Sequence, residues 1–222
     1  MSTVAPKTVA TSPAGRPSAA RRSPWLHPAA KPLLFIVCCL PLLYLIWAAT
    51  QDQLGANPAE ALIRRLGDWA LRGLCLTLSI TPLRFISKQP ALLRFRRMLG
   101  LFSFAYGSLH LAAYAWLDMG LEFADIAHDI AKRPFILMGF AAWALMLPLA
   151  ATSFNRAIKA LGGKRWQWLH KLVYAVIVIA LLHFIWMRAG KNNFAEPAVY
   201  GAVIALLLGW RLLTAIRQRR AS

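Results

Sequence analysis

Six apolar runs, each close to 20 residues long, constrain the fold of this 222-residue chain more than any other feature. An α-helix rises about 1.5 Å per residue, so about 20 residues cross the roughly 30 Å hydrocarbon core of a bilayer. Apolar residues make up 59% of the chain and charged residues only 15%, whereas soluble domains average about 45–50% and about 25%. The sequence therefore predicts an all-α, polytopic membrane bundle of six transmembrane helices. The six runs are Leu33–Thr50, Trp69–Ile86, Met98–Leu117, Pro134–Thr152, Leu169–Met187 and Pro197–Ile216.

Positive charge is concentrated in alternate segments of the chain. The 26 Lys and Arg outnumber the 8 Asp and Glu, for a formal net charge of +18. On a soluble protein this charge balance would indicate nucleic-acid binding. In a chain with membrane-length apolar runs it instead indicates that the positive charge lies in one set of loops, and we expect no nucleic-acid partner. Nineteen basic residues lie in the two terminal segments and the second-to-third and fourth-to-fifth connections, one lies within the second run, and only six lie in the other loops. By the positive-inside rule both termini are cytoplasmic. The six are Arg64, Arg65, Lys132, Arg133, Arg188 and Lys191.

The remaining segments are short. Residues 1–31 are rich in Ser, Thr, Pro and Ala and lack an apolar face, which predicts a disordered cytoplasmic tail rather than a signal peptide. Residues 32–216 form the membrane domain, and residues 217–222 form a basic cytoplasmic tail. The sequence thus predicts one membrane domain and no second soluble domain.

Two histidines lie at matching depth inside the predicted spans. His110 and His183 lie about 18 and 21 Å from the cytoplasmic ends of their runs, at about 1.5 Å per residue. Ionisable groups inside a membrane usually mark function, although a structural hydrogen bond is the alternative for either histidine alone. Two imidazoles from facing helices are typical ligands of a b-type haem, whereas a hydrolytic zinc site needs a third ligand. Because no Asp or Glu lies deep in any run, the pair indicates haem.

A third histidine, His170, lies at the cytoplasmic start of the fifth run. It precedes His183 by thirteen residues, which is about 19.5 Å on an ideal helix and leaves the two side chains about 140° apart around the axis. At the corresponding depth the third run offers Arg96 rather than a histidine. Arg96 or Arg97 could pair with the propionates of a second haem, or both could be ordinary cytoplasmic loop charges.

These residues resemble a known family. Over about residues 60–215 the chain is similar to the haem-binding membrane subunits of periplasmic protein-methionine-sulfoxide reductase systems, within the ferric-reductase-like transmembrane superfamily. The stretch from Trp166 to Phe184 is the most specific, and thirteen-residue spacing of the fifth-helix histidines is typical of the superfamily. The resemblance depends on Thr81-Pro82-Leu83-Arg84, Arg96-Arg97-Met98-Leu99-Gly100-Leu101, Leu109-His110, Thr152-Ser153, Trp166-Gln167-Trp168-Leu169-His170-Lys171-Leu172-Val173-Tyr174 and Leu182-His183-Phe184.

The resemblance implies an electron-transfer subunit of the bacterial inner membrane. Such a subunit holds one or two b-type haems, and an FMN is attributed to the family. His110, His170 and His183 would ligate iron, with Arg96 and Arg97 beside the cofactor. Electrons would come from the quinone pool or a cytosolic flavin reductase and pass to a periplasmic, molybdopterin-containing subunit that reduces methionine sulfoxide. The chain would therefore hold no catalytic residue for the sulfoxide chemistry.

Three other functions stay open from the residues alone. Within haem proteins, the nearest alternative is a stand-alone transmembrane ferric or other metal reductase. A transporter would need broken helices or paired charges near the middle of the bilayer, and the only candidate breaks, Pro82 and Pro148, lie toward span ends. A structural membrane protein would leave the level-matched histidines unexplained.

The charge pattern makes a testable prediction about orientation. A fluorescent reporter that matures only in the cytoplasm should be active when fused after Ser222, because the C-terminal segment is basic. A phosphatase that folds only in the periplasm should be inactive at the same position. Active phosphatase there would contradict the six-span arrangement.

Overall fold

The computed structural model describes residues 24–190 and 192–221, and over these residues the chain is built from helices. The elements are η1 (Pro24–Leu26), α1 (Ala30–Thr50), α2 (Pro58–Ser87), η2 (Pro90–Leu92), α3 (Leu93–Ala113), η3 (Tyr114–Asp118), α4 (Phe123–Lys132), α5 (Pro134–Ala151), α6 (Asn155–Leu161), α7 (Gly163–Leu169), α8 (Leu172–Ala189) and α9 (Ala195–Ala221). Residues 1–23 of the expected tail at residues 1–31 lie outside the described residues, whereas residues 24–31 are described and include η1 and the start of α1. Each apolar run coincides over most of its length with one long helix, although the boundaries differ; α2 begins eleven residues before its run, whereas α8 begins three residues after the start of its run.

Five helical segments of the described chain are long and apolar enough to cross a membrane. They contain the first, third, fourth, fifth and sixth apolar runs. The second run lies in α2, whose first half also carries five charged side chains, and so α2 is not among the five. That α2 forms a sixth span remains a prediction. The five segments are Ala30–Thr50, Pro90–Asp118, Pro134–Ala151, Gly163–Ala189 and Ala195–Arg220.

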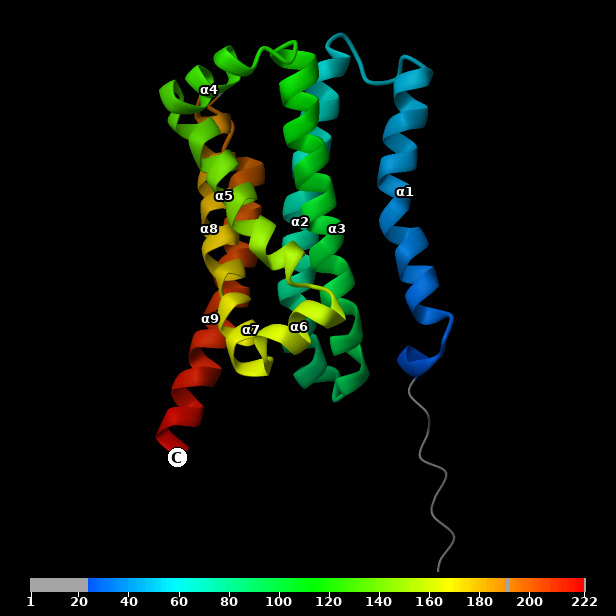
Figure 1. The fold of residues 1–222 in the computed structure, drawn as a ribbon, viewed down its shortest axis with the longest axis vertical. Coiled ribbons are helices and arrows are strands. Elements are labelled where there is room, and N and C mark those ends of the chain that lie inside the picture. The colour runs from blue at the N-terminus through cyan, green and yellow to red at the C-terminus, as the bar shows by residue number, and fades with distance from the viewer. Residues whose placement is uncertain (1–23, 191, 222) are drawn as a thin grey trace, which may run out of the picture.

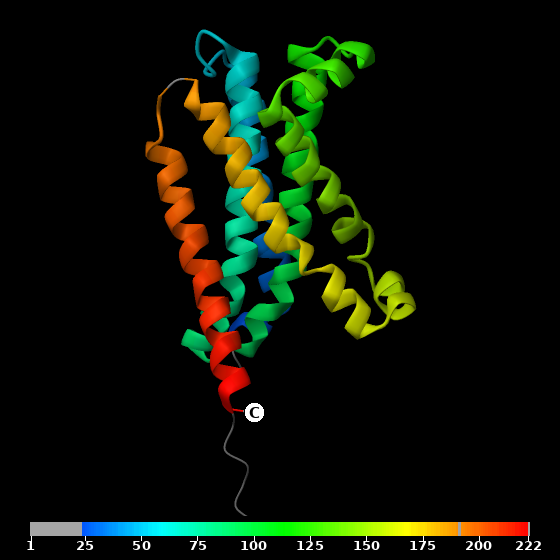
Figure 2. The same cartoon turned by 90° about the vertical axis from the view of Figure 1, so that its left-hand side faces the viewer.

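Two helix pairs make up the centre of the bundle. Helix α2 packs along α3, and α5 packs along α8. The two pairs face each other through α3–α5 and α2–α8 contacts, α9 covers α2 and α8, and α1 lies at the periphery against α2 and α3 (Figures 1 and 2). The largest core cluster joins α2, α5, α8 and α9 around Leu78, Val176 and Ile177. Helix α1 begins and α9 ends at the same end of the bundle (Figure 1).

The outer surface of the bundle is apolar. Leu206 on α9 is 75% exposed and Ile36 on α1 is 56% exposed, and many other large apolar side chains also face outward. In water such a surface would drive aggregation, whereas lipid tails solvate it. Together with the five spans, this surface identifies a multi-pass membrane protein.

Helix α1 is attached to α3 by a hydroxyl inserted into its backbone. Pro41 interrupts α1 because proline has no N–H group. Next to it, the Leu42 N–H donates to the Tyr106 hydroxyl at 3.1 Å, and that hydroxyl donates to the Cys38 carbonyl at 2.8 Å. In an ordinary helix these two backbone groups bond to each other, and here the Tyr106 hydroxyl is a hydrogen-bond partner of both.

The connections contain helices that the apolar pattern did not indicate. Helix α4 lies in the third-to-fourth connection, and α6 and α7 lie in the fourth-to-fifth. The chain also leaves regular helix at His170 and Lys171, between α7 and α8, so the distance estimated along one ideal helix from His170 to His183 does not apply. At the other terminus, α9 continues to Ala221 and includes the basic residues after Ile216.

We predict that Tyr106→Phe loosens α1. The change leaves the Leu42 N–H and the Cys38 carbonyl without the hydroxyl, which should lower the free energy of unfolding by about 1–3 kcal/mol. Thermal unfolding in detergent measures this, with Tyr44→Phe as the control because Tyr44 is 53% exposed on α1. Equal unfolding temperatures for the two variants would contradict the predicted role of Tyr106.

Candidate functional site

Two histidines face each other between the two helix pairs. His110 lies near the end of α3, and His183 lies in α8. Their ring centroids are 6.1 Å apart, with an angle of 72° between the ring planes. The structure thus brings together the two histidines that the depth estimate paired.

Each of these imidazoles is held by a backbone carbonyl of the partner helix in its pair. His110 Nδ1 lies 2.8 Å from the Ile63 carbonyl oxygen of α2, and His183 Nδ1 lies 2.6 Å from the Phe135 carbonyl oxygen of α5. A carbonyl oxygen only accepts hydrogen bonds, so each Nδ1 must carry the proton. In the neutral ring, Nε2 then has a free lone pair. Both side chains are therefore prepared as metal ligands through Nε2.

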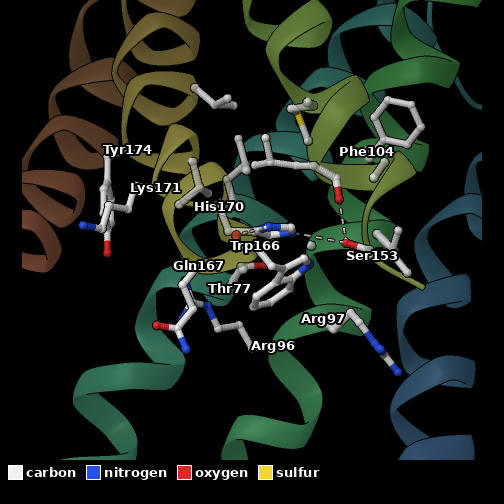
Figure 3. Close-up of a pocket in the computed structure, with 18 of the residues that line it drawn as sticks. Thr77, Arg96, Arg97, Phe104, Ser153, Trp166, Gln167, His170, Lys171 and Tyr174 are labelled. Carbon is white, nitrogen blue, oxygen red and sulfur yellow. Dashed lines mark hydrogen bonds between the residues drawn. The ribbon is translucent and has the colours of Figure 1, made fainter. Parts of the chain in front are cut away.

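A cavity of about 480 Å³ lies between the same two helix pairs, toward the end of the bundle where α9 ends. Residues of α2, α3, α5, α7 and α8 line it (Figure 3). Its volume is within the range of about 300–1,000 Å³ that is usual for cofactor pockets. His170, Arg96 and Arg97 line this cavity, whereas His110 and His183 do not.

His170 is fixed at the wall of the cavity by three contacts. Its ring stacks on Trp166 with the centroids 3.9 Å apart, its Nδ1 lies 3.0 Å from the Trp166 carbonyl oxygen, and its Nε2 lies 3.5 Å from the Ser153 hydroxyl. Trp166 is itself held because its indole N–H donates to the Thr152 carbonyl at 2.9 Å. His170 and Ser153 point toward each other in Figure 3.

The cavity is positively charged. Its lining within the described chain includes Arg96, Arg97 and Lys171 and no acidic side chain. Arg97 donates to the neutral Asn155 side chain at 2.8 Å, and Arg96 makes no hydrogen bond or ion pair with a described residue. Guanidinium groups without carboxylate partners favour ligands that bring phosphate or carboxylate groups.

Aromatic side chains lie between the histidine pair and the cavity. Phe104 lines the cavity and stacks with Trp143 at a centroid distance of 6.4 Å. The Trp143 indole N–H donates to the Ser108 hydroxyl at 3.0 Å, two residues before His110. Trp143 therefore has a partner for its polar atom in the middle of the bundle and contacts Phe104 of the cavity lining.

Comparison with known proteins decides the family. The model of the ferric reductase like transmembrane component matches residues 66–181, about half of the chain. The chain is 66% identical to the protein-methionine-sulfoxide reductase heme-binding subunit MsrQ of Polaromonas naphthalenivorans, over 87% of this chain and 89% of that protein. The MsrQ of Bordetella pertussis is 52% identical over 86% and 93% of the two chains, and that of Xanthomonas euvesicatoria is 43% identical over 87% and 90%.

This chain belongs to the MsrQ family. The sequence motifs had indicated the same family, and the comparisons confirm it. The family-model match includes His110 and His170 but ends before His183. In this MsrQ-family chain the five residues singled out from the sequence divide into two groups, with His110 and His183 in one and Arg96, Arg97 and His170 in the other.

Arg211 is a residue that the sequence analysis counted only as a loop charge. It lies on α9, and its guanidinium donates to the Tyr174 hydroxyl at 2.6 Å and to the Leu78 carbonyl at 2.8 Å. The Leu78 carbonyl needs this donor because residue 82, which would normally supply one, is a proline. Tyr174 in turn lines the cavity, so Arg211 supports its wall from behind. Only the proline at position 82 could have indicated such a need in the sequence.

We predict that Arg211→Leu destabilises this MsrQ-family bundle. The Leu78 carbonyl and the Tyr174 hydroxyl would lose a charged donor, which should cost about 2–3 kcal/mol of unfolding free energy. Thermal unfolding in detergent measures the effect, with Arg217→Leu as the control because Arg217 is exposed on the same helix. A loss no greater than that of the control would show that the contact contributes nothing.

Proposed function

We propose that this chain is a transmembrane electron-transfer subunit that holds a b-type haem between His110 and His183. The separation of the two imidazoles, 6.1 Å between ring centroids, carries this proposal. A metal–imidazole bond is about 2 Å long, so two imidazoles that share one iron would have ring centroids about 6 Å apart. The names of the MsrQ relatives, which describe heme-binding subunits, support the same cofactor.

The protein's part in this chemistry is to hold and insulate the ligands. The Ile63 and Phe135 carbonyls fix the two rings and increase the electron density at Nε2 by accepting the Nδ1 protons. The bundle keeps water away, which favours neutral imidazole and lets the pair ligate iron in both oxidation states. A haem bound there supplies one-electron chemistry.

The positively charged cavity is the proposed site at which electrons enter. Its cations suit the propionates of a second haem, ligated by His170, or the phosphate of an FMN, and its apolar walls also suit a quinone headgroup. Electrons would come from the quinone pool or a cytosolic flavin reductase. Phe104 and Trp143 then lie between the entry site and the histidine pair.

The proposed setting is the bacterial inner membrane, with six spans including α2 and with both termini in the cytoplasm. The basic segments near the cavity support this orientation, because positive loops favour the cytoplasmic side. The proposed electron acceptor is a periplasmic, molybdopterin-containing subunit that reduces methionine sulfoxide, so this chain would not itself be the catalyst. The names of the relatives, which refer to protein-methionine-sulfoxide reductase, support this partner.

A stand-alone metal reductase is the second candidate, because the family-model match is to a ferric reductase like component. The two functions differ in what oxidises the reduced protein. As a subunit, the purified chain should be reoxidised by its periplasmic partner with methionine sulfoxide. As a metal reductase, it should be reoxidised by chelated ferric iron alone.

Substitution of the three histidines tests the proposal. His110→Ala and His183→Ala should each abolish the low-spin haem spectrum, because each removes one of two ligands. His170→Ala should retain that haem but slow its reduction by a cytoplasmic donor. Haem content per protein and the rate of haem reduction are the measurements, with His128→Ala as the control because His128 is exposed on α4.

Two results would contradict this assignment. Unchanged haem content and an unchanged low-spin spectrum in His110→Ala would exclude it as a ligand. Loss of the same haem in His170→Ala, with His183→Ala unaffected, would mean that His170 is the partner of His110.

A further inference from the structure

The two imidazoles make the same kind of contact with their neighbouring helices, although the sequence shows no repeat. In each case a histidine of one helix reaches a carbonyl of its neighbour, and a glycine stands four residues after that carbonyl. Gly67 follows Ile63 on α2 beneath His110, and Gly139 follows Phe135 on α5 beneath His183. The glycine precedes its histidine by 43 residues in the first pair and by 44 in the second.

A side chain at either glycine would crowd an imidazole. A Cβ at Gly67 would lie 3.1 Å from His110 Nδ1 and 3.2 Å from its Cε1. A Cβ at Gly139 would lie 2.9 Å from both Nδ1 and Cε1 of His183. In both cases the atoms that a methyl group would meet are ring atoms of the imidazole.

Helix geometry explains the spacing of four residues. A helical carbonyl is bonded to the N–H four residues later, and it has a second lone pair that can accept another donor. Helical Cβ atoms tilt toward the N-terminus, so the side chain at the later position covers that carbonyl. Only glycine leaves the carbonyl open to a ring from a neighbouring helix.

We propose that Gly67 and Gly139 are positioning residues that hold the two imidazoles with Nδ1 protonated and Nε2 facing a shared metal centre. This inference rests on the proposed haem site and adds the residues that determine the separation and tautomer of its ligands. Gly107 stands one turn before His110, but a Cβ there would meet Ala70 at an ordinary packing distance of 3.9 Å and no imidazole.

A pair of double-mutant cycles tests the inference without depending on haem. Gly67→Ala should lower the unfolding temperature when His110 is present. In the His110→Ala background, where the ring that it meets is gone, it should leave the unfolding temperature unchanged or raise it, because alanine favours a helix more than glycine does. Gly139→Ala should behave in the same way with His183. Should Gly67→Ala alone fail to fold, the double variant is still expected to fold. Equal losses in both backgrounds, or a double variant that does not fold, would overturn the inference.

Spectroscopy of the haem-loaded protein supplies the second readout. Gly67→Ala and Gly139→Ala should each weaken haem binding about 10- to 100-fold, the usual effect of disturbing the groups that orient a metal ligand. The remaining haem should show a partly high-spin spectrum and a shifted midpoint potential. A wild-type spectrum and potential in both variants would overturn the inference.

Gly73→Ala is the matched control. Gly73 lies on the same helix, and its Cβ would collide with the Ser103 hydroxyl rather than with an imidazole. This variant should lose stability but retain the low-spin spectrum. A high-spin shift in Gly73→Ala as large as that in Gly67→Ala would overturn the inference, because general helix packing would then explain both.

The two levels of the proposal fail differently. If His110→Ala and His183→Ala each retain the wild-type haem spectrum, the proposed haem site is wrong, and the inference is wrong with it. If those histidines prove to be the ligands but the glycine variants match the wild type, only the inference is wrong.

Discussion

The bundle depends on two hydrogen bonds from imidazole to backbone carbonyl, one within each helix pair. A polar N–H without a partner in a membrane interior costs about 1–3 kcal/mol, and a charged imidazole would cost more. Bonding each Nδ1 proton to a carbonyl keeps the rings neutral and ties α3 to α2 and α8 to α5. The same two hydrogen bonds therefore pair the helices and leave each Nε2 free to ligate a metal.

The two regions between the helix pairs differ in charge and chemistry. At the histidine pair the polar atoms are uncharged and consist of two ring nitrogens with free lone pairs. At the cavity, Arg96, Arg97 and Lys171 are lining residues, and no carboxylate lies among the described lining residues. A bundle with these two regions suits a relay in which an anionic or quinone cofactor at one end passes electrons to a metal centre nearer the other. Trp143 and Phe104 occupy the intervening space.

Much of this arrangement could be predicted from local patterns, and the failures have physical causes. Apolar runs predicted the long helices, since lipid imposes a length, and a simple rise per residue paired His110 with His183 correctly. The same arithmetic assumed one continuous helix from His170 to His183, whereas the regular helix is interrupted at His170 and Lys171, between α7 and α8. Helix α4 was missed because ten residues at a membrane surface need no long apolar run.

The sequence by itself determined the class of the protein, the family and the identities of the histidines, because span length, motif spacing and residue type are properties of a linear chain. Only the tertiary structure decided that Gly67 and Gly139 lie against the imidazoles. It also decided that Arg211 donates to the Leu78 carbonyl, which has no donor at Pro82. Those roles come from atoms on different helices that meet only after folding. A glycine or an arginine in a membrane helix can have many roles, and which role it has depends on the residues that it contacts on neighbouring helices.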